Sequence, residues 1–266
     1  MDKIVFRLIG IVSLFSISLW AANQMNWMEL FGVEENISST EQKVGELLWE
    51  FYSANNTEVT KDDLLLPIDS ILTKICESNS IERDEIKLHL INNDEVNAFA
   101  LPNNHLVIYS GLLVAVKNEA ELSGVIGHEI AHLQMDHVMK KLVKEIGLAV
   151  IITMTSGNGN SQVLLESIKT LTSSAYDRSL EEEADFKSVD YLIKADIDPT
   201  AFANFLYTLG GNNPDAEELM SWVSTHPYSK ERAEEIVNYS QKKNYKAKQV
   251  LDSATWHILK KEAERL

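Results

Sequence analysis

The sequence predicts an α+β protein in which helices dominate and a small three-stranded antiparallel sheet lies beside a central helix. Segments with apolar residues at helical period flank residues 85–110, where three short apolar runs alternate with turn-forming residues. With 266 residues, of which 45% are hydrophobic, the chain can form one domain with a substantial core but not two large ones. We therefore expect residues 23–266 to form a single domain.

Two amphipathic helices are expected first. Residues 39–52, STEQKVGELLWEFY, place apolar side chains on one helical face and begin with serine and threonine, which often cap helix N-termini. Residues 64–79, LLLPIDSILTKICESN, indicate a second helix.

Three strands are expected next, in EIKLHLI, VNAFAL and LVIYS. The first run alternates apolar and polar residues, and NNDE and PNNH between the runs favour turns. This order predicts three antiparallel strands and then a helix that opens near Ser110. His89 and His105 lie in these strands, and we expect both to be ordinary surface histidines.

The stretch GVIGHEIAHLQMDH, residues 124–137, contains three of the chain's seven histidines. Apolar residues recur around it at helical spacing, so His128 and His132 are expected one turn apart on the same helix face, where both imidazoles can bind one metal ion. Glu129 lies about a quarter-turn away and can reach a water molecule on that metal. H-E-x-x-H is typical of a zinc site with a general base, which predicts one zinc ion per chain.

His137 is a weaker candidate ligand. In the metzincin pattern a third histidine follows the first by ten positions, after a glycine that turns the chain back. His137 follows His128 by nine positions with no glycine between them. On a continuous helix it would point away from His128, so we expect a surface residue or one that supports the ligands from behind.

The third ligand is expected in RSLEEEADFKSVDYL, residues 178–192. Two histidines and a glutamate form a common catalytic zinc set. Glu181 and Asp185 share a helix face, so Glu181 can bind the metal while Asp185 accepts the free ring N–H of a ligand histidine. Spacing alone leaves Glu182 and Glu183 as competitors, and consecutive glutamates also suit a solvated helix start.

Three motifs together resemble the HtpX and CAAX-prenyl-protease family of gluzincin metallopeptidases, especially its soluble, periplasmic, single-domain bacterial members. They are EAELSGVIGHEIAHLQMDH, RSLEEEAD and THPYSKER, which occur in the family's order within residues 41–240. The resemblance implies a zincin-like fold, with Glu181 as the ligand and Asp185 behind the ligands. It also implies that polypeptides, in particular misfolded or damaged envelope proteins, are the substrates.

The function that follows is a zinc endopeptidase in which Glu129 moves the protons. One alternative is a zinc-binding chaperone or assembly factor of the envelope that cleaves little, although such a protein would not need Glu129. Another is a zinc hydrolase that acts on something other than peptides.

The histidine of WVSTHPYSKERAEEI, His226, has two interpretations. From the residues alone it lies in a surface loop that Pro227 rigidifies, before a helix that Ser229 caps near Lys230. The resemblance instead implies that His226 lies beside the open zinc position, with Arg232 in a supporting role. There His226 would stabilise the oxyanion of the tetrahedral intermediate, or occupy the open position and hold the enzyme inactive.

Two further segments near the cleft follow from the resemblance. The strand Asn97, Ala98, Phe99, Ala100 resembles one that lies along the family's active cleft, where an edge strand can bind an extended peptide; without the resemblance it is a hairpin strand. Asn103 and Asn104 replace the family's frequent turn glycine and tolerate left-handed backbone. Residues 146–152 are expected to continue the active-site helix as a buried segment. The SGNGNS break, residues 156–161, is either a gate over the cleft or a plain loop.

The N-terminus and the composition bear on location and partners. Residues 1–22 carry Lys3 and Arg7 before an apolar stretch, which predicts a cleaved secretory signal or an uncleaved membrane anchor, and so a periplasmic or envelope location with possible membrane association. The net charge of −16 makes nucleic acid an unexpected partner, and the single cysteine, Cys76, excludes an internal disulfide.

Overall fold

The computed structural model describes residues 33–158, 160–209, 222–227 and 229–266. The chain divides into two compact units, residues 1–41 and 42–266. In the first unit the described residues belong to the start of α3 (Val33–Ser53). The expected signal or anchor, residues 1–22, lies outside the described residues. Among those that are described, no helix is both long enough and apolar enough to cross a membrane.

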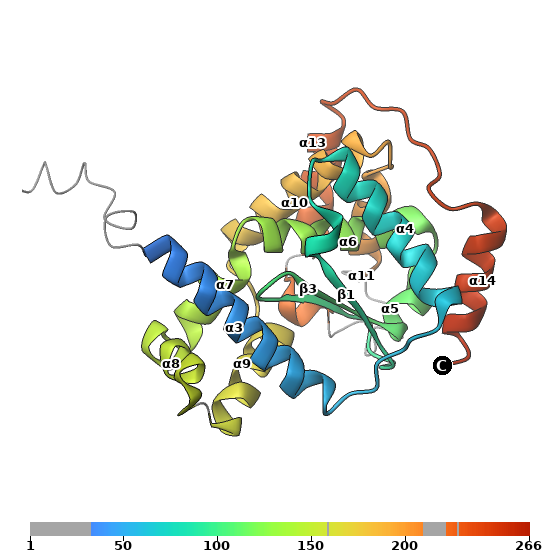
Figure 1. The fold of residues 1–266 in the computed structure, drawn as a ribbon. Helices are drawn as coiled ribbons and strands as arrows, with labels where there is room; N and C mark the ends of the chain where they lie inside the picture. The colour runs from blue at the N-terminus through green and yellow to red at the C-terminus, as the bar shows by residue number, and fades with distance from the viewer. Residues whose placement is uncertain (1–32, 159, 210–221, 228) are drawn as a thin grey trace, which may run out of the picture. The chain divides into compact units, whose positions relative to one another are not determined.

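The second unit combines many helices with one small sheet, which confirms the predicted α+β class (Figure 1). A helical turn spans residues 222–225. After α3 the elements are α4 (Asp62–Ser78), η1 (Arg83–Glu85), β1 (Lys87–Ile91), β2 (Ala98–Leu101), β3 (His105–Tyr109), α5 (Ser110–Ala115), α6 (Glu119–Gln134), α7 (His137–Glu145), α8 (Leu148–Thr153), η2 (Met154–Asn158), α9 (Ser161–Ser173), α10 (Arg178–Lys194), α11 (Thr200–Leu209), α13 (Ser229–Ser240) and α14 (Ser253–Ala263).

Most predicted helices are present, but one boundary differs. The helix expected from residue 39 begins at Val33. Residues 33–38 contain no glycine or proline, and the two glutamates Glu34 and Glu35 favour a helix start there. The helix expected at residues 64–79 is α4, and the one expected near Ser110 is α5.

The sheet has β3 at its centre, in the order β1-β3-β2. β2 and β3 form the predicted antiparallel hairpin through Asn103 and Asn104, whose φ angles are 61° and 59°. Two consecutive residues with positive φ suit a tight hairpin turn, so asparagine replaces glycine here without difficulty. β1 instead pairs with β3 in parallel, with Lys87 opposite His105. The expectation of three antiparallel strands is therefore wrong for β1.

The chain between β1 and β2 explains this pairing, since it crosses the end of β3 and does not form a tight turn. The Asn93 carbonyl accepts hydrogen bonds from Gly111 N and Ser110 Oγ, both at 2.9 Å. A Cβ atom on Gly111 would lie 2.2 Å from the Asp94 carbonyl oxygen, so only glycine permits the approach. The crossing leaves β2 on the far edge of the sheet.

Both faces of the sheet are buried. One face packs into a core that α4, α6, α10 and α11 share, and the other packs against α3 and the α7–α9 segment. On the second face Trp49 stacks on His89 with ring centroids 3.5 Å apart, and His105 is 1% exposed. The prediction that both are ordinary surface histidines is wrong, because α3 covers this face.

The central helix is α6, which is buried on nearly every side. It packs against β2 and against α10 and α11 (Figure 1). A Cβ atom on Gly124 would lie 2.3 Å from Phe202 Cβ, and one on Gly127 would lie 2.9 Å from Ser188 Oγ. These glycines allow α10 and α11 to approach α6 closely, and so bring the motifs of α6 and α10 together.

The chain after α6 does not continue that helix, so the expectation for residues 146–152 is wrong. α6 ends at Gln134, Asp136 takes a left-handed φ of 57°, and Gly147, with a φ of 93°, separates α7 from α8. Leu148 and Ile152 are 53% and 50% exposed, although Ile151 is buried. In the expected break at residues 156–161, η2 ends at Asn158 and Asn160 caps α9. A gating role stays a prediction.

Candidate active site

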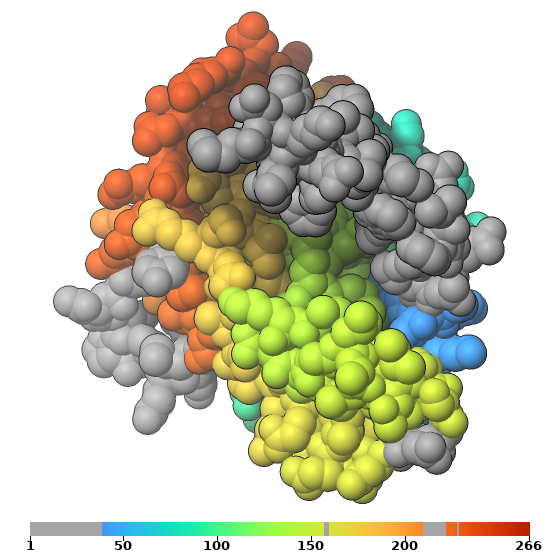
Figure 2. All heavy atoms as spheres, turned by 90° about the vertical axis from the view of Figure 1, so that its left-hand side faces the viewer, coloured from blue at the N-terminus to red at the C-terminus, as the bar shows by residue number. Residues whose placement is uncertain are grey.

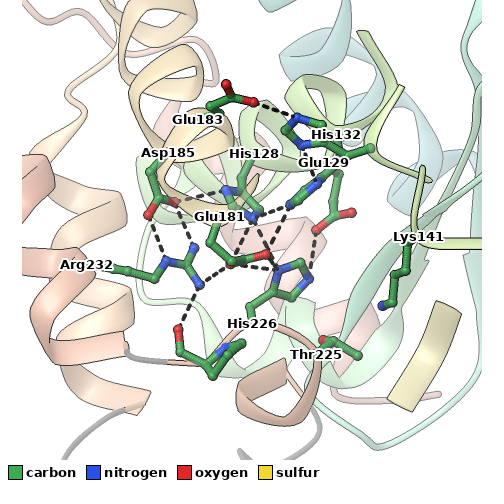
Figure 3. A network of polar contacts seen from close by, with 12 residues as sticks. His128, Glu129, His132, Lys141, Glu181, Glu183, Asp185, Thr225, His226 and Arg232 are labelled. Carbon is green, nitrogen blue, oxygen red and sulfur yellow. Dashed lines mark hydrogen bonds and ion pairs between the residues drawn. The ribbon is translucent and has the colours of Figure 1, made fainter. Parts of the chain in front are cut away.

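Four side chains from three parts of the chain meet in the interior (Figure 3). They are His128 and His132 of α6, Glu181 of α10, and His226, which precedes α13. One potential ligand atom from each lies within 4.8 Å of the others, and all four residues are fully buried. His128 Nε2 is 3.0 Å from His132 Nε2, and His226 Nδ1 is 2.9 Å from Glu181 Oε1. The group can hold one metal ion.

Each histidine of the H-E-x-x-H motif turns its other ring nitrogen to a partner. His128 Nδ1 lies 3.0 Å from Asp185 Oδ1. His132 Nδ1 lies 3.1 Å from His137 Nδ1, and His137 Nε2 lies 3.2 Å from Glu183 Oε2. Partners of this kind hold the proton on Nδ1 and leave the Nε2 lone pair for a metal. The convergence of the two Nε2 atoms fits a cation between them.

The charges also fit a zinc ion. Burial lowers the pKa of His132 well below its usual range and that of His226 to about 4, so both rings are neutral, as metal ligands must be. Burial alone would raise the pKa of Glu181, but Arg232 and His226 hold it well below the usual range. Neutral imidazoles with a carboxylate are a donor set that zinc prefers.

His137 shows how the tertiary structure changes a helical expectation. The left-handed residue Asp136 breaks the chain between α6 and α7, and His137 therefore folds back against His132. Its ring is fully buried. The surface interpretation of His137 is wrong, and the contact with His132 places it behind the ligands.

Glu129 points to the same site from α6. Its side chain is buried, and neither carboxylate oxygen has a hydrogen-bond partner among the described residues. His226 Nε2 lies 3.4 Å from Glu129 Oε1. Burial and the nearby Glu181 carboxylate raise the pKa of Glu129 well above its usual range, whereas Lys141 and Arg232 act in the opposite direction. A buried carboxylate with free acceptor sites can receive a proton from a water molecule beside it.

Arg232 of α13 ties the acidic residues together. Its Nε and Nη2 donate to the two Asp185 oxygens, each at 2.7 Å, and its Nη1 forms an ion pair with Glu181 Oε2. All three side chains are buried. Arg232 thereby orients both carboxylates, in line with the supporting role that the resemblance implied. The competing ligand Glu183 has a side chain 55% exposed and contacts His137 instead.

His226 is held by the turn that precedes it. Its backbone N–H donates to the Trp222 carbonyl at 2.8 Å, and its ring stacks on the Trp222 indole with centroids 4.0 Å apart. α13 begins at Ser229, whose Oγ has no hydrogen-bond partner in the described part of the chain, so the expected capping bond is absent there. His226 is no surface loop residue, since it is buried among the ligands.

The segment expected to bind substrate lies beside this site. β2 is an edge strand of the sheet and packs against α6. The four residues Asn97, Ala98, Phe99 and Ala100 are each at most 2% exposed. The Ala100 backbone N–H is near enough to Glu129 to lower the pKa of its carboxyl group. A substrate-binding role for this strand stays a prediction.

Two residues near the ligands carry no signal in the sequence. The Tyr176 ring stacks on His132 with centroids 4.1 Å apart. Lys141 Nζ lies 3.9 Å from the centroid of the same ring, and Figure 3 shows Lys141 across the cluster from Arg232. Both residues lie between the recognised motifs, where no spacing rule singles them out.

Comparisons with known proteins agree with this geometry. The model of peptidase family M48 matches residues 67–240. The chain is 28% identical over 178 residues to the beta-barrel assembly-enhancing protease of Yersinia pestis, covering 62% of this chain and 36% of that protein. It is 28% identical over 210 residues to the mitochondrial metalloendopeptidase OMA1 of Bos taurus, covering 71% of this chain and 39% of that protein.

A third relative is closer in length. The chain is 31% identical over 164 residues to the metalloprotease LoiP of Escherichia coli strain K12, covering 59% of this chain and 64% of that protein. The matched region spans less than two thirds of each of these relatives. The match nevertheless includes both metal-site helices and His226, and the chain belongs to peptidase family M48, as the resemblance of its three motifs predicted.

Proposed function

We propose that this protein is a zinc-dependent endopeptidase. One observation carries the proposal: His128, His132, Glu181 and His226 converge in a buried group beside the buried carboxylate of Glu129. His128, His132 and Glu181 would hold the ion. Zinc bound there supplies Lewis-acid chemistry, which polarises the scissile carbonyl and makes water a stronger acid.

The chain's own residues then move the protons. Glu129 accepts a proton from the attacking water and passes it to the leaving amine, so the reaction needs no covalent intermediate with the protein. Arg232 and Asp185 keep Glu181 and His128 in place through buried hydrogen bonds and ion pairs. His226 lies close enough to Glu129 and to the ligands to stabilise an oxyanion, or to take a fourth ligand position and block the site.

The substrates we propose are misfolded or damaged proteins of the cell envelope, and the location is the periplasm or the envelope. Support comes from a relative whose name refers to beta-barrel assembly and from the signal-like N-terminal sequence. An extended peptide would pair with the edge of β2, next to Glu129. The alternative is a zinc-binding chaperone or assembly factor, which would bind the same chains with little cleavage.

Hydrolysis of casein by the purified protein tests the enzyme directly. We expect cleavage that 1,10-phenanthroline abolishes and stoichiometric zinc restores, and that the Glu129→Gln variant lacks. Zinc-loaded protein that suppresses aggregation of unfolded proteins without cutting casein would favour the chaperone. If neither activity appears, a zinc hydrolase with a non-peptide substrate becomes the better hypothesis.

Substrates and location are tested separately in cells. The Glu129→Gln variant should trap full-length envelope proteins, which cross-linking and mass spectrometry would identify. Fractionation should place the protein in the periplasm or with the envelope. Recovery of mainly cytoplasmic clients would contradict the proposed role even if casein is cleaved.

A further inference from the structure

A small cationic pocket lies between α7 and the chain that enters α10. Figure 2 shows this face, where the yellow-green spheres of α7 lie next to the yellow spheres of the chain entering α10. The pocket encloses about 220 Å³ and is lined by Lys140, Lys141, Lys144, Glu145, Ala175, Tyr176, Asp177 and Leu180. Three lysines in one pocket are unexpected in a chain with a net charge of −16.

The lysines differ in their partners. Lys144 Nζ is 2.6 Å from Asp177 Oδ1, and Lys140 Nζ donates to the Met135 carbonyl at the surface. Lys141 is 4% exposed, and its Nζ donates to the Ser174 carbonyl at 2.5 Å. In the part of the chain that the structure describes, no carboxylate forms an ion pair with Lys141. The more distant carboxylates of Glu181, Glu129 and Glu145 offset part of the cost of burying its charge, and two of its three N–H donors stay available.

The ammonium group of Lys141 is charged at neutral pH and faces the active site. Burial lowers the pKa of Lys141 to about 8, which leaves it mainly protonated at pH 7. Its Nζ lies over the Tyr176 ring, and that ring stacks on the ligand His132. The pocket is therefore one aromatic ring away from the proposed zinc ion.

The pocket also contains the carboxylates of Glu145 and Asp177, and both pair with Lys144. Asp177 and Leu180 line the pocket at the N-terminus of α10, a helix whose first backbone N–H groups point outward. Glu181, one residue further along, belongs to the metal group. Pockets for drug-sized ligands enclose about 300–1,000 Å³, so this one has room for a single side chain or a chain end.

We propose that this pocket is a specificity subsite that receives a carboxylate of the peptide substrate, with the Lys141 ammonium as its counter-ion. The carboxylate belongs either to an acidic side chain near the scissile bond or to the C-terminus of the substrate chain. The inference rests on the proposed function, because it assumes that a peptide is bound at the adjacent site. Lys141 would thus select substrates without taking part in the proton transfers.

Binding to the inactive Glu129→Gln variant tests the subsite without requiring cleavage. Acetylated and amidated degenerate peptide pools, each with Glu or Gln at one fixed position, are compared by fluorescence anisotropy. A third set has Gln and a free C-terminal carboxylate. We expect one of two results. At one position the Glu pool binds at least about tenfold more tightly than the Gln pool, or the pool with a free C-terminal carboxylate binds at least about tenfold more tightly than the amidated pool. The first result identifies an acidic side chain, the second a chain end.

Two further variants in the Glu129→Gln background assign the preference to the pocket. Lys141→Met should abolish it, whereas Lys169→Met, an equal charge change on the exposed face of α9, should leave it intact. A preference that survives Lys141→Met overturns the assignment. Equal binding of all pools to the protein with Lys141 intact overturns the proposal even if Lys141→Met does not fold. Carboxylate preference without casein cleavage would support the subsite while the endopeptidase proposal fails.

Discussion

Arg232 and Asp185 form a bidentate pair across the α13–α10 contact, with two hydrogen bonds of 2.7 Å between fully buried groups. The same aspartate lies 3.0 Å from His128 Nδ1. One carboxylate therefore links α13 to a histidine of the metal group on α6. An arginine suits this position because its planar guanidinium group can pair with Asp185 and Glu181 at once.

Asp185→Asn is expected to weaken zinc binding by about 10–100-fold, because the amide no longer anchors the His128 ring as a carboxylate does. Titration against a competing chelator measures the change. Asp190→Asn is the matched control, since Asp190 lies on the same helix but pairs with Lys243 at the surface. Unchanged zinc affinity in Asp185→Asn would show that Asp185 does not orient the ligand.

Glu129→Gln is expected to retain about one zinc ion per chain and to lose about 10²–10⁴-fold in proteolysis, because the ligands remain while the proton acceptor is gone. Metal analysis and casein hydrolysis on the same sample give both values. Substantial activity in the zinc-replete variant would refute the role of Glu129.

Glu181→Ala is expected to lower zinc occupancy and activity together, since it removes one of the converging ligands. Glu182→Ala, the adjacent change on the same helix, should be nearly neutral. Metal analysis after dialysis compares the two variants. If Glu182→Ala proved the more damaging change, the ligand assignment on α10 would be off by one residue.

His226→Ala separates the two roles of that histidine. Loss of an oxyanion donor should reduce the turnover number by about 10²–10³ with zinc retained, and this is the result we expect. Loss of a blocking ligand should instead raise the turnover number. This alternative is supported by the contact of His226 Nδ1 with His128 Nε2 at 3.2 Å. Turnover of the zinc-loaded variant decides the matter, and a rate equal to wild type would exclude both roles.

Acid is expected to destabilise the fold through the histidines under α3. Burial and the neighbouring His89 lower the pKa of His105 from 6.5 to about 4. Between these values the unfolded chain binds more protons, so the free energy of unfolding falls as the pH is lowered from 6.5 towards 4. Urea denaturation at several pH values should show that the free energy of unfolding depends less steeply on pH in His105→Phe than in wild type. Equal slopes would mean that His105 titrates normally in the folded protein.

Much of the active-site helix could be predicted because its geometry is local. Residues four apart on any helix share a face, so the spacing of His128 and His132 predicts one metal site without knowledge of the fold. The break at Asp136 could not be predicted in this way. A left-handed aspartate carries no strong sequence signal, and it returns His137 to His132 after the helix has ended.

In the sheet, too, one part could be predicted from local sequence and another could not. The hairpin of β2 and β3 follows from two asparagines that tolerate positive φ, which is a property of the turn itself. The parallel pairing of β1 depends on how the chain crosses β3 near Gly111, and the burial of His105 depends on α3, which is remote in the sequence. Neither is determined by residues near β1.

By itself, the sequence determined the helix-dominated α+β class, the family, the zinc motif on α6 and the acidic motif on α10, because each depends on residue type at short spacing. The tertiary structure alone decided which atoms meet. Close approach at Gly124 and Gly127 brings α10 and α11 against α6, and the turn before α13 inserts His226 among the ligands. Lys141 and Tyr176 reach the site only through this packing. Contacts between residues distant in the chain arise from the packing of whole elements, which short-range patterns do not encode.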